Sequence, residues 1–120
     1  QKEVRMSFSR VKAVYVVDSV ETEDVLVFDL FVNADNSVRP MEIFGYAIDD
    51  GEKWPIYVKP KGKEGLLYWG AGEEDTKSTV NLFQRNIRVG EYITRVDIYD
   101  SETSEYTYRI TEIFDWSQLR

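Results

Sequence analysis

The sequence predicts an all-β fold: a single antiparallel β-sandwich of about eight or nine short strands, immunoglobulin-like and without a substantial helix. Three observations predict it. Residues 90–114 hold two runs that alternate apolar and polar side chains around a short polar turn. Asp50-Gly51 separates two further runs, and Asp-Gly is the strongest short-range indication of a two-residue hairpin. Turn-forming residues recur about every ten positions, and no segment shows a helical period.

The first half of the chain contains four expected strands separated by polar turns. Residues 25–33 form an apolar run in which Leu26, Phe28 and Leu30 share one face, while the opposite face is also largely apolar. A strand that is apolar on both faces is typical of the centre of a sheet. The strands expected here span residues 2–8, 11–17, 25–33 and 41–48, with turns at 18–24 and 34–37.

The second half continues with shorter strands and ends in the late hairpin. In that hairpin we expect Val96 and Ile98 to face the core and Tyr92 to form a tyrosine corner, with its hydroxyl bonded to nearby backbone. The strands expected before it span residues 53–58, 66–69 and 78–83, with loops at 59–65 and 71–76 and at most a helical turn at 115–120.

Two strands are expected at sheet edges, namely the first one and residues 78–83. Unpaired backbone groups at an edge can recruit another strand, so we expect a monomer or an edge-strand homodimer. No repeat, linker or low-complexity segment divides the chain. Residues 1–120 are therefore expected to form one domain.

Charge and missing residue types exclude several classes of function. The net charge of −7 disfavours nucleic acid and anionic membrane surfaces, both of which attract Lys and Arg. The chain has no His and no Cys, which excludes Ser-His-Asp triads, thiol nucleophiles and the usual zinc sites. No run approaches the roughly 20 apolar residues of a membrane span. With 22 acidic residues some carboxylate pair is inevitable, so such pairs do not indicate catalysis, and we expect a protein that is not an enzyme.

Two segments follow patterns found in a known group of domains. Residues 25–56 contain an apolar strand ending in Asn, a polar turn and a strand closed by Asp-Asp-Gly. Val89-Gly-Glu-Tyr92 precedes the alternating Val96, Ile98 and Asp100. Both segments resemble bacterial immunoglobulin-like domains of secreted and envelope proteins. The resemblance implies a secreted, periplasmic or cell-envelope module for adhesion, ligand binding or assembly, and we expect a secretory signal upstream of Gln1 in a longer parent sequence.

An aromatic group beside the 59–65 loop is the candidate ligand-binding site. Tyr57, Tyr68 and Trp69 flank this loop and are expected to be exposed, whereas Trp54 shares a strand face with Ile56 and is expected in the core. Exposed rings of this kind stack on sugars and anchor protein partners. We therefore expect a glycan or protein partner at these three residues.

Acidic residues around the last hairpin are the candidate metal site. Hard cations such as Ca²⁺ bind six to eight oxygen ligands, so carboxylates of neighbouring loops could hold one. Asp49, Asp50 and Glu52, or Glu73, Glu74 and Asp75, could complete the site if their loops meet. The residues of the candidate site itself are Asp97, Asp100, Glu102 and Glu105.

These observations favour a non-enzymatic, extracytoplasmic binding or structural module without a cofactor, unless calcium binds. Two alternatives remain open. A small acidic inhibitor or immunity protein could block a basic enzyme, which clustering of the carboxylates on one face would favour. A calcium-dependent lectin is the other alternative.

Overall fold

The chain forms eight consecutive antiparallel strands in the computed structural model, which describes residues 6–70 and 76–118. Two short 3₁₀ helices, η1 (Leu82–Gln84) and η2 (Trp116–Gln118), accompany them. The strands are β1 (Ser7–Val17), β2 (Val20–Val32), β3 (Ile43–Asp49), β4 (Glu52–Lys61), β5 (Glu64–Trp69), β6 (Lys77–Val80), β7 (Tyr92–Tyr99) and β8 (Glu102–Asp115).

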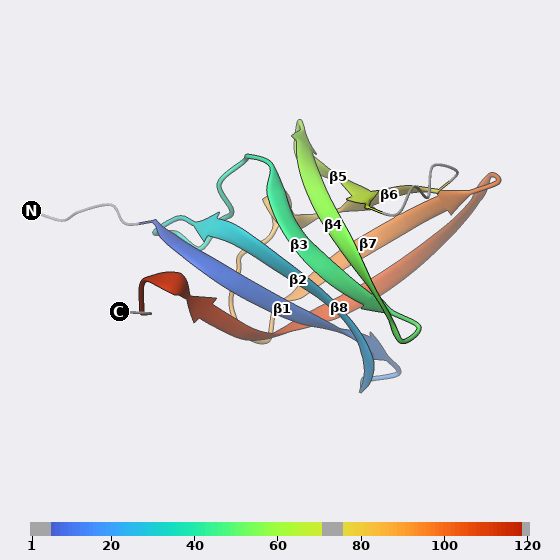
Figure 1. The fold of residues 1–120 in the computed structure, drawn as a ribbon, viewed down its shortest axis with the longest axis horizontal. Helices are drawn as coiled ribbons and strands as arrows, with labels where there is room; N and C mark the ends of the chain where they lie inside the picture. Colours follow the sequence, from blue (N-terminus) through green and yellow to red (C-terminus); the bar gives the residue numbers. More distant parts are fainter. Residues whose placement is uncertain (1–5, 71–75, 119–120) are drawn as a thin grey trace, which may run out of the picture.

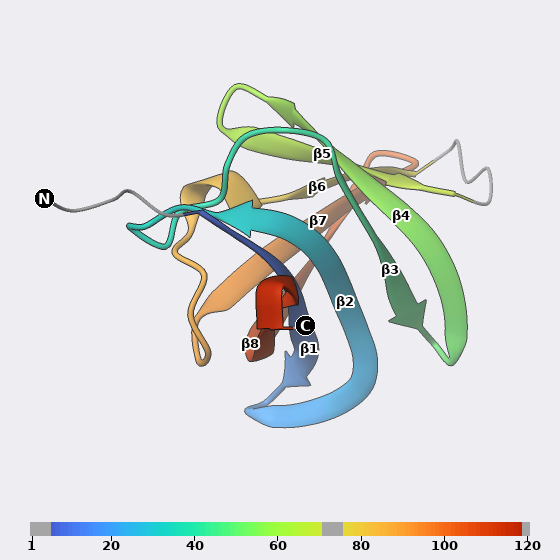
Figure 2. The ribbon, with the colours of Figure 1, turned by 60° about the vertical axis from the view of Figure 1, so that its left-hand side comes forward.

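The strands close into a single barrel, so the expected sandwich is wrong although the all-β class is correct. Each strand pairs with the next in sequence, and β8 then pairs with β1, for example Val11 with Ile113. Figures 1 and 2 show the strands surrounding one common interior. Closure also removes the expected edges within the described residues, because β1 is paired with β2 and β8, and β6 with β5 and β7. Strand addition at β1 and β6 is therefore not available, while residues 2–5 of the expected first strand lie outside the described residues.

Long, curved strands make the closure possible. The residues expected to form a separate second strand continue directly from Ser7 in β1, and β2 curves strongly along its length (Figure 2). The β1–β2 register shifts between Val14 and Val16, and such irregularities bend a strand and increase its twist. At Gly45 in β3 an added Cβ would lie 1.8 Å from the Val27 carbonyl oxygen, so only glycine permits this close approach of β3 to β2.

The turns at one end of the barrel are short and well defined. Asp50 and Gly51 both have positive φ, as a type I′ turn requires, and the hairpin expected there is confirmed. Asp18-Ser19 and Asp100-Ser101 form equivalent two-residue turns with positive φ. These three turns define what we call the turn end of the barrel, on the right in Figure 1.

The interior is apolar over most of its length. Phe28 on β2 and Ile110 on β8 are fully buried, and Leu82 from the β6–β7 connection joins the same cluster. Burial of these side chains is the main source of stability. The other fully enclosed members include Val11, Leu26, Leu30, Ile43, Val58, Ile87 and Ile93.

The late hairpin turns the opposite face inward from the one expected. Ile93 and Arg95 on β7 are buried, while Ile98 is 44% exposed. The prediction that Val96 and Ile98 face the core is therefore wrong, and Arg95 and Asp97 occupy the interior face in their place. Tyr92 is 43% exposed at the start of β7. Among the described residues, no helix has the length and apolar character needed to cross a membrane.

Candidate functional site

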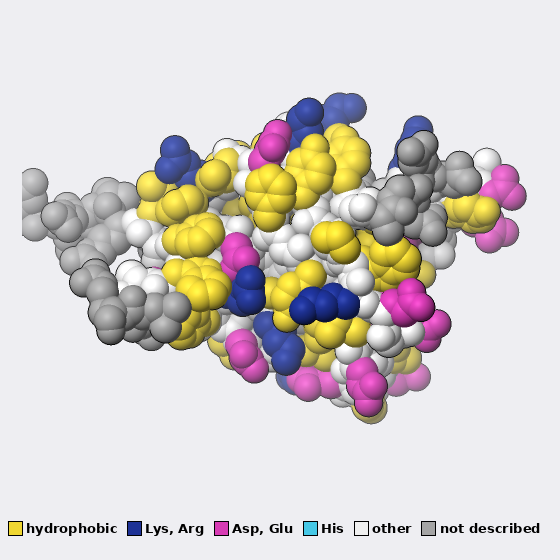
Figure 3. Space-filling model, in the orientation of Figure 1, with side chains coloured by type: hydrophobic (Ala, Val, Ile, Leu, Met, Phe, Trp, Pro, Cys, Tyr) yellow, Lys and Arg dark blue, Asp and Glu magenta, His cyan; other side chains and the backbone are white. Residues whose placement is uncertain are grey.

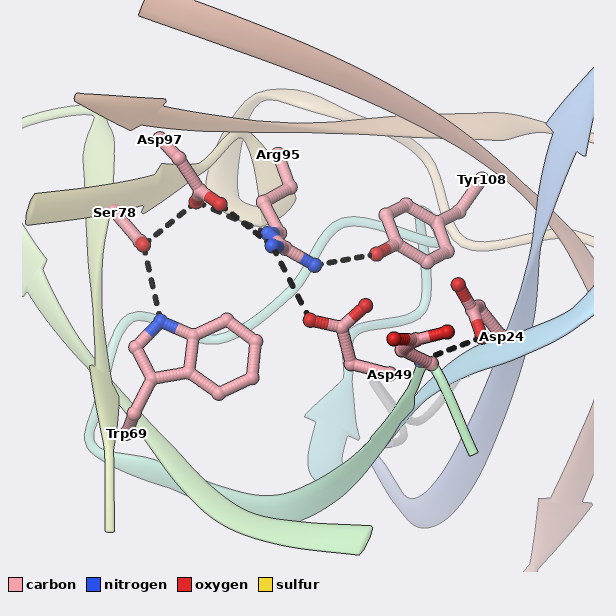
Figure 4. A network of polar contacts seen from close by, with 8 residues as sticks. Asp24, Asp49, Trp69, Ser78, Arg95, Asp97 and Tyr108 are labelled. Carbon is pink, nitrogen blue, oxygen red and sulfur yellow. Dashed lines mark hydrogen bonds and ion pairs between the residues drawn. The ribbon is translucent and has the colours of Figure 1, made fainter. Parts of the chain in front are cut away.

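A buried arginine organises the interior of the barrel at the turn end (Figure 4). Arg95 projects from β7 with only 5% of its side chain exposed. Its Nε and Nη2 donate hydrogen bonds to the two carboxylate oxygens of Asp97, at 3.0 and 2.5 Å, and its Nη1 donates to the Tyr108 hydroxyl at 2.8 Å. Period-two alternation places Arg95 and Asp97 on one face of the same strand, so the pair forms locally. The pair neutralises its own charge within the interior.

Two further polar side chains hold Asp97 in place. The Ser78 hydroxyl on β6 donates to Asp97 at 2.7 Å, and the Trp69 indole N–H on β5 donates to the Ser78 oxygen at 3.0 Å. Each buried polar group in this chain of contacts therefore has a partner, which is the condition for a stable buried polar network. With Tyr108 on β8, the network connects four consecutive strands, from β5 to β8.

Aromatic rings surround the guanidinium. Its central carbon lies 4.7 Å from the Trp69 ring centroid and 4.4 Å from that of Tyr106, within the range of cation–π attraction. Burial opposes the charge of Arg95, but its hydrogen bonds to Asp97 and the nearby acidic groups together outweigh it, and the pKa of Arg95 is raised. Burial also raises the pKa of Tyr108 to about 12, although the nearby Arg95 opposes this. Both groups keep their ordinary protonation states at neutral pH.

A cavity of about 190 Å³ lies above this network, and we call it the mouth pocket. The half-buried indoles of Trp54 on β4 and Trp69 on β5 line it, together with Thr76 and the Arg95–Asp97 pair. Asp49, the last residue of β3, completes the lining. Its carboxylate lies 3.9 Å from Nη2 of Arg95, beyond hydrogen-bond distance, and its side chain is 42% exposed.

Asp49 gives the described lining of the mouth pocket a net negative charge. Two carboxylates share the single cation Arg95, since Asp97 forms the bidentate pair and Asp49 a longer ion pair at 3.9 Å. Burial raises the pKa of Asp49; Arg95 opposes the shift, and the neighbouring carboxylates of Asp24, Asp97 and Asp50 add to it. A carboxylate beside indole walls provides an ion-pair partner and apolar ring surface for a positively charged group.

The expected ligand-binding residues lie on both sides of the barrel wall. Trp69 is part of the mouth pocket, whereas Tyr57 and Tyr68 face outward. With Phe44 they form a row across β3, β4 and β5, which we call the outer aromatic row. Neighbouring rings are 5.5 and 5.0 Å apart and nearly parallel, at 17° and 22°. At this spacing the rings cover one another's faces, so few faces remain open for a sugar.

Figure 3 shows hydrophobic side chains over the upper part of β3 and β4, with Lys or Arg side chains above them. Phe44 is 61% and Tyr68 43% exposed, so the outer aromatic row is accessible at its two ends. Its directly paired cross-strand rings stabilise the sheet irrespective of any ligand.

The expected metal-ligating residues are not gathered into one site. Asp97 is bound to Arg95 and Ser78 inside the barrel, while Asp100, Glu102 and Glu105 are exposed around the last hairpin. Within 6–70 and 76–118, no group of three or more acidic side chains is arranged to hold a metal ion. The alternative ligands Glu73, Glu74 and Asp75 lie outside the described residues.

A larger hollow of about 590 Å³ lies on the outer surface over β1, β2, β3 and β8. Its floor is apolar, with Val14, Val25 and Val27 buried. Its rim is charged and partly paired with itself, since Arg109 forms an ion pair with Glu21 and Lys12 lies 3.9 Å from Glu112. Among the described contacts the hollow has no buried polar group directed into it, whereas the buried Arg95–Asp97 pair lines the mouth pocket, so the mouth pocket is the better-built candidate.

Sequence reasoning did not identify Arg95, Asp49 or Trp54 as members of one site. One pattern in the sequence could have indicated the buried pair. Ile93, Arg95 and Asp97 occupy alternate positions of one strand, so an apolar residue and two opposite charges share a face. Comparison with known proteins adds no assignment: no protein-family model, no curated protein and no solved structure matches the chain.

Proposed function

We propose that this protein is a non-enzymatic binding module that holds a positively charged group in the mouth pocket. The observation that carries the proposal is the Asp49 carboxylate, which shares its one cation with Asp97 and lines the pocket together with the indoles of Trp54 and Trp69. Cationic groups bind such sites through charge pairing and attraction to ring faces. The Arg95–Asp97 pair supports the site from below and has no free charge to attract an anion.

A binding role accords better with this chemistry than catalysis. Asp97 accepts hydrogen bonds from Arg95 and Ser78, and Arg95 donates to two partners, so these groups serve to fix the pocket. The extracytoplasmic setting stays a prediction of the sequence. A glycan at the outer aromatic row is a weaker proposal, because the stacked rings already occupy one another's faces.

Small probes that differ only in charge test the proposal. Propylammonium and methylguanidinium should quench or shift tryptophan fluorescence, while propionate and propanol should not. Asp49→Asn should weaken binding of the cations by roughly tenfold or more, the scale of one charge-assisted contact. Asp50→Asn is the matched control, since it removes the same charge one residue away and leaves an Asn-Gly sequence that suits the turn.

The comparison of Asp49→Asn with Asp50→Asn separates binding in the mouth pocket from attraction of the cations to the overall negative charge of the protein. Equal weakening by Asp49→Asn and Asp50→Asn would mean that the cations respond only to the overall negative charge. Binding of propionate as tight as that of propylammonium would contradict a cation site.

A further inference from the structure

The negative charge of the protein is concentrated at the turn end. In Figure 3 the acidic side chains gather on the right, where the hairpins of β1–β2, β3–β4 and β7–β8 end. The acidic residues in segments 17–24, 47–54 and 95–106 are Asp18, Glu21, Glu23, Asp24, Asp49, Asp50, Glu52, Asp97, Asp100, Glu102 and Glu105. The basic residues in these segments and in 76–79 are Lys53, Lys77 and Arg95. Arg95 is buried, and Lys53 lies over the Tyr46 ring at 4.2 Å.

The same end exposes apolar side chains beside its turns. Val20 is 64% and Tyr99 56% exposed, and Val17 and Ile98 are more than two-fifths exposed. A surface that served only solubility would carry few exposed residues of this kind. The opposite end also exposes apolar residues such as Val89, but there basic residues such as Lys61 and Arg88 lie among acidic ones. Among the described residues, the turn end therefore combines apolar anchors with a large excess of acidic over basic side chains.

This surface is held in a fixed shape. The three two-residue turns leave few backbone degrees of freedom, and the Asp50 backbone N–H donates to the Asp24 carboxylate at 3.0 Å, which connects two hairpins. A preorganised surface loses little conformational entropy when a partner binds. Exposed apolar residues on a rigid frame with a charged rim are the usual composition of a protein-binding surface.

From these observations we infer that the turn end docks a basic protein surface, and that one lysine or arginine side chain of that partner enters the mouth pocket. The inference rests on the proposed function and specifies the source of the cation. A cavity of about 190 Å³ suits one side chain, while the acidic and apolar surface around it extends over three hairpins, beyond the reach of a small molecule. Tyr99 is the next residue after Asp97 on the same face of β7, so it lies along the strand from the pocket, on the side where a residue flanking the inserted side chain would pack.

Short blocked peptides provide the test. Acetyl-Gly-Lys-Gly-amide and acetyl-Leu-Lys-Leu-amide carry the same single charge and differ in their apolar flanks. We expect the leucine peptide to bind roughly tenfold more tightly, since one buried apolar anchor contributes on this scale. Tyr99→Ser should remove this advantage. Tyr92→Ser is the matched control, because Tyr92 is a 43% exposed tyrosine at the opposite end of the same strand, and it should leave the advantage unchanged.

The outcomes separate the inference from the proposed function. If neither peptide nor propylammonium binds, the proposed function itself fails. If both peptides bind with equal affinity, or Tyr99→Ser and Tyr92→Ser behave alike, the cation site stands and the protein-docking inference is overturned in favour of a small-molecule ligand. Circular dichroism of both variants shows whether they are folded, and a Tyr99→Leu variant, which should restore the advantage of the leucine peptide, keeps the test valid if the serine variant is unstable.

Discussion

Tyr68 and Trp69 are neighbours in sequence and lie on opposite sides of the barrel wall. Trp69 faces inward, donates to Ser78 and lines the mouth pocket, while Tyr68 stacks on Tyr57 in the outer aromatic row. The two regions use aromatic rings differently. In the outer row the ring faces contact each other, whereas in the pocket the indoles adjoin a guanidinium, a carboxylate and an open volume. Ring surface left accessible beside a charge distinguishes a binding region from a stabilising one.

The largest expected effect is a loss of stability when the buried Arg95–Asp97 pair is broken. Asp97→Ala leaves Arg95 buried without its bidentate partner, and loss of one member of a buried pair costs about 3–5 kcal/mol. Urea denaturation should show this decrease in the free energy of unfolding. Replacing both members, as in Arg95→Met with Asp97→Ala, should recover much of the loss, because no unpaired charge remains. A single variant as stable as the wild type would show that Arg95 does not depend on Asp97.

A smaller effect is expected from the outer aromatic row. Tyr57 contacts both Phe44 and Tyr68, and Tyr57→Ala should lower the free energy of unfolding by about 1 kcal/mol, the scale of aromatic cross-strand pairs. Tyr57→Phe keeps the ring and should leave the denaturation midpoint unchanged. Binding of propylammonium should be the same in both variants. Weaker cation binding in Tyr57→Ala would show that the two regions are coupled, against the distinction drawn above.

Local features of the fold were predictable from the sequence because they depend on local chemistry. Asp50-Gly51 predicts its hairpin since both residues tolerate positive φ, and the alternation over 90–114 predicts β7 and β8. The closure of the strands into a barrel was not predictable from such local chemistry. It rests on pairing between β1 and β8, about a hundred residues apart in sequence, and strands of a sandwich and of a barrel alternate alike.

The mouth pocket was not predicted, because the sequence pattern indicated that the wrong face of β7 is buried. Tyr92, Val96 and Ile98 make the more apolar face, so the alternation alone assigns them to the core. The inward face carries Arg95 and Asp97 instead, because Ser78 and Tyr108 from other strands complete their hydrogen bonds. These partners lie on β6 and β8, so they become visible only once the pairing of both strands with β7 is known. Of the three grouped aromatic residues, Tyr57 and Tyr68 stack on each other, while alternation within β5 places Trp69 on the opposite side of the barrel wall.

The smallest expected effect concerns Asp49, whose replacement should raise the melting temperature rather than lower it. Burial raises its pKa despite the attraction of Arg95, and three nearby carboxylates add to the shift. A raised pKa in the folded state means that the native protein binds this proton more tightly than the unfolded chain, so ionisation of Asp49 lowers stability as the pH rises through that pKa. Asp49→Asn should therefore raise the melting temperature at pH 7, and the gain over the wild type should shrink as the pH falls below the raised pKa.

Asp35→Asn provides a control of opposite sign. Hydrogen bonds from Ser37 lower the pKa of Asp35, so its carboxylate favours the folded state above about pH 4 and its removal should not raise the melting temperature. A carboxylate kept for stability would behave like Asp35. If Asp49 lowers the stability of the ligand-free protein and is still required for propylammonium binding, the stability lost by its ionisation is recovered when the cation binds. A melting temperature of Asp49→Asn below that of the wild type at pH 7 would instead make Asp49 a structural partner of Arg95, and the mouth pocket a by-product of that pair.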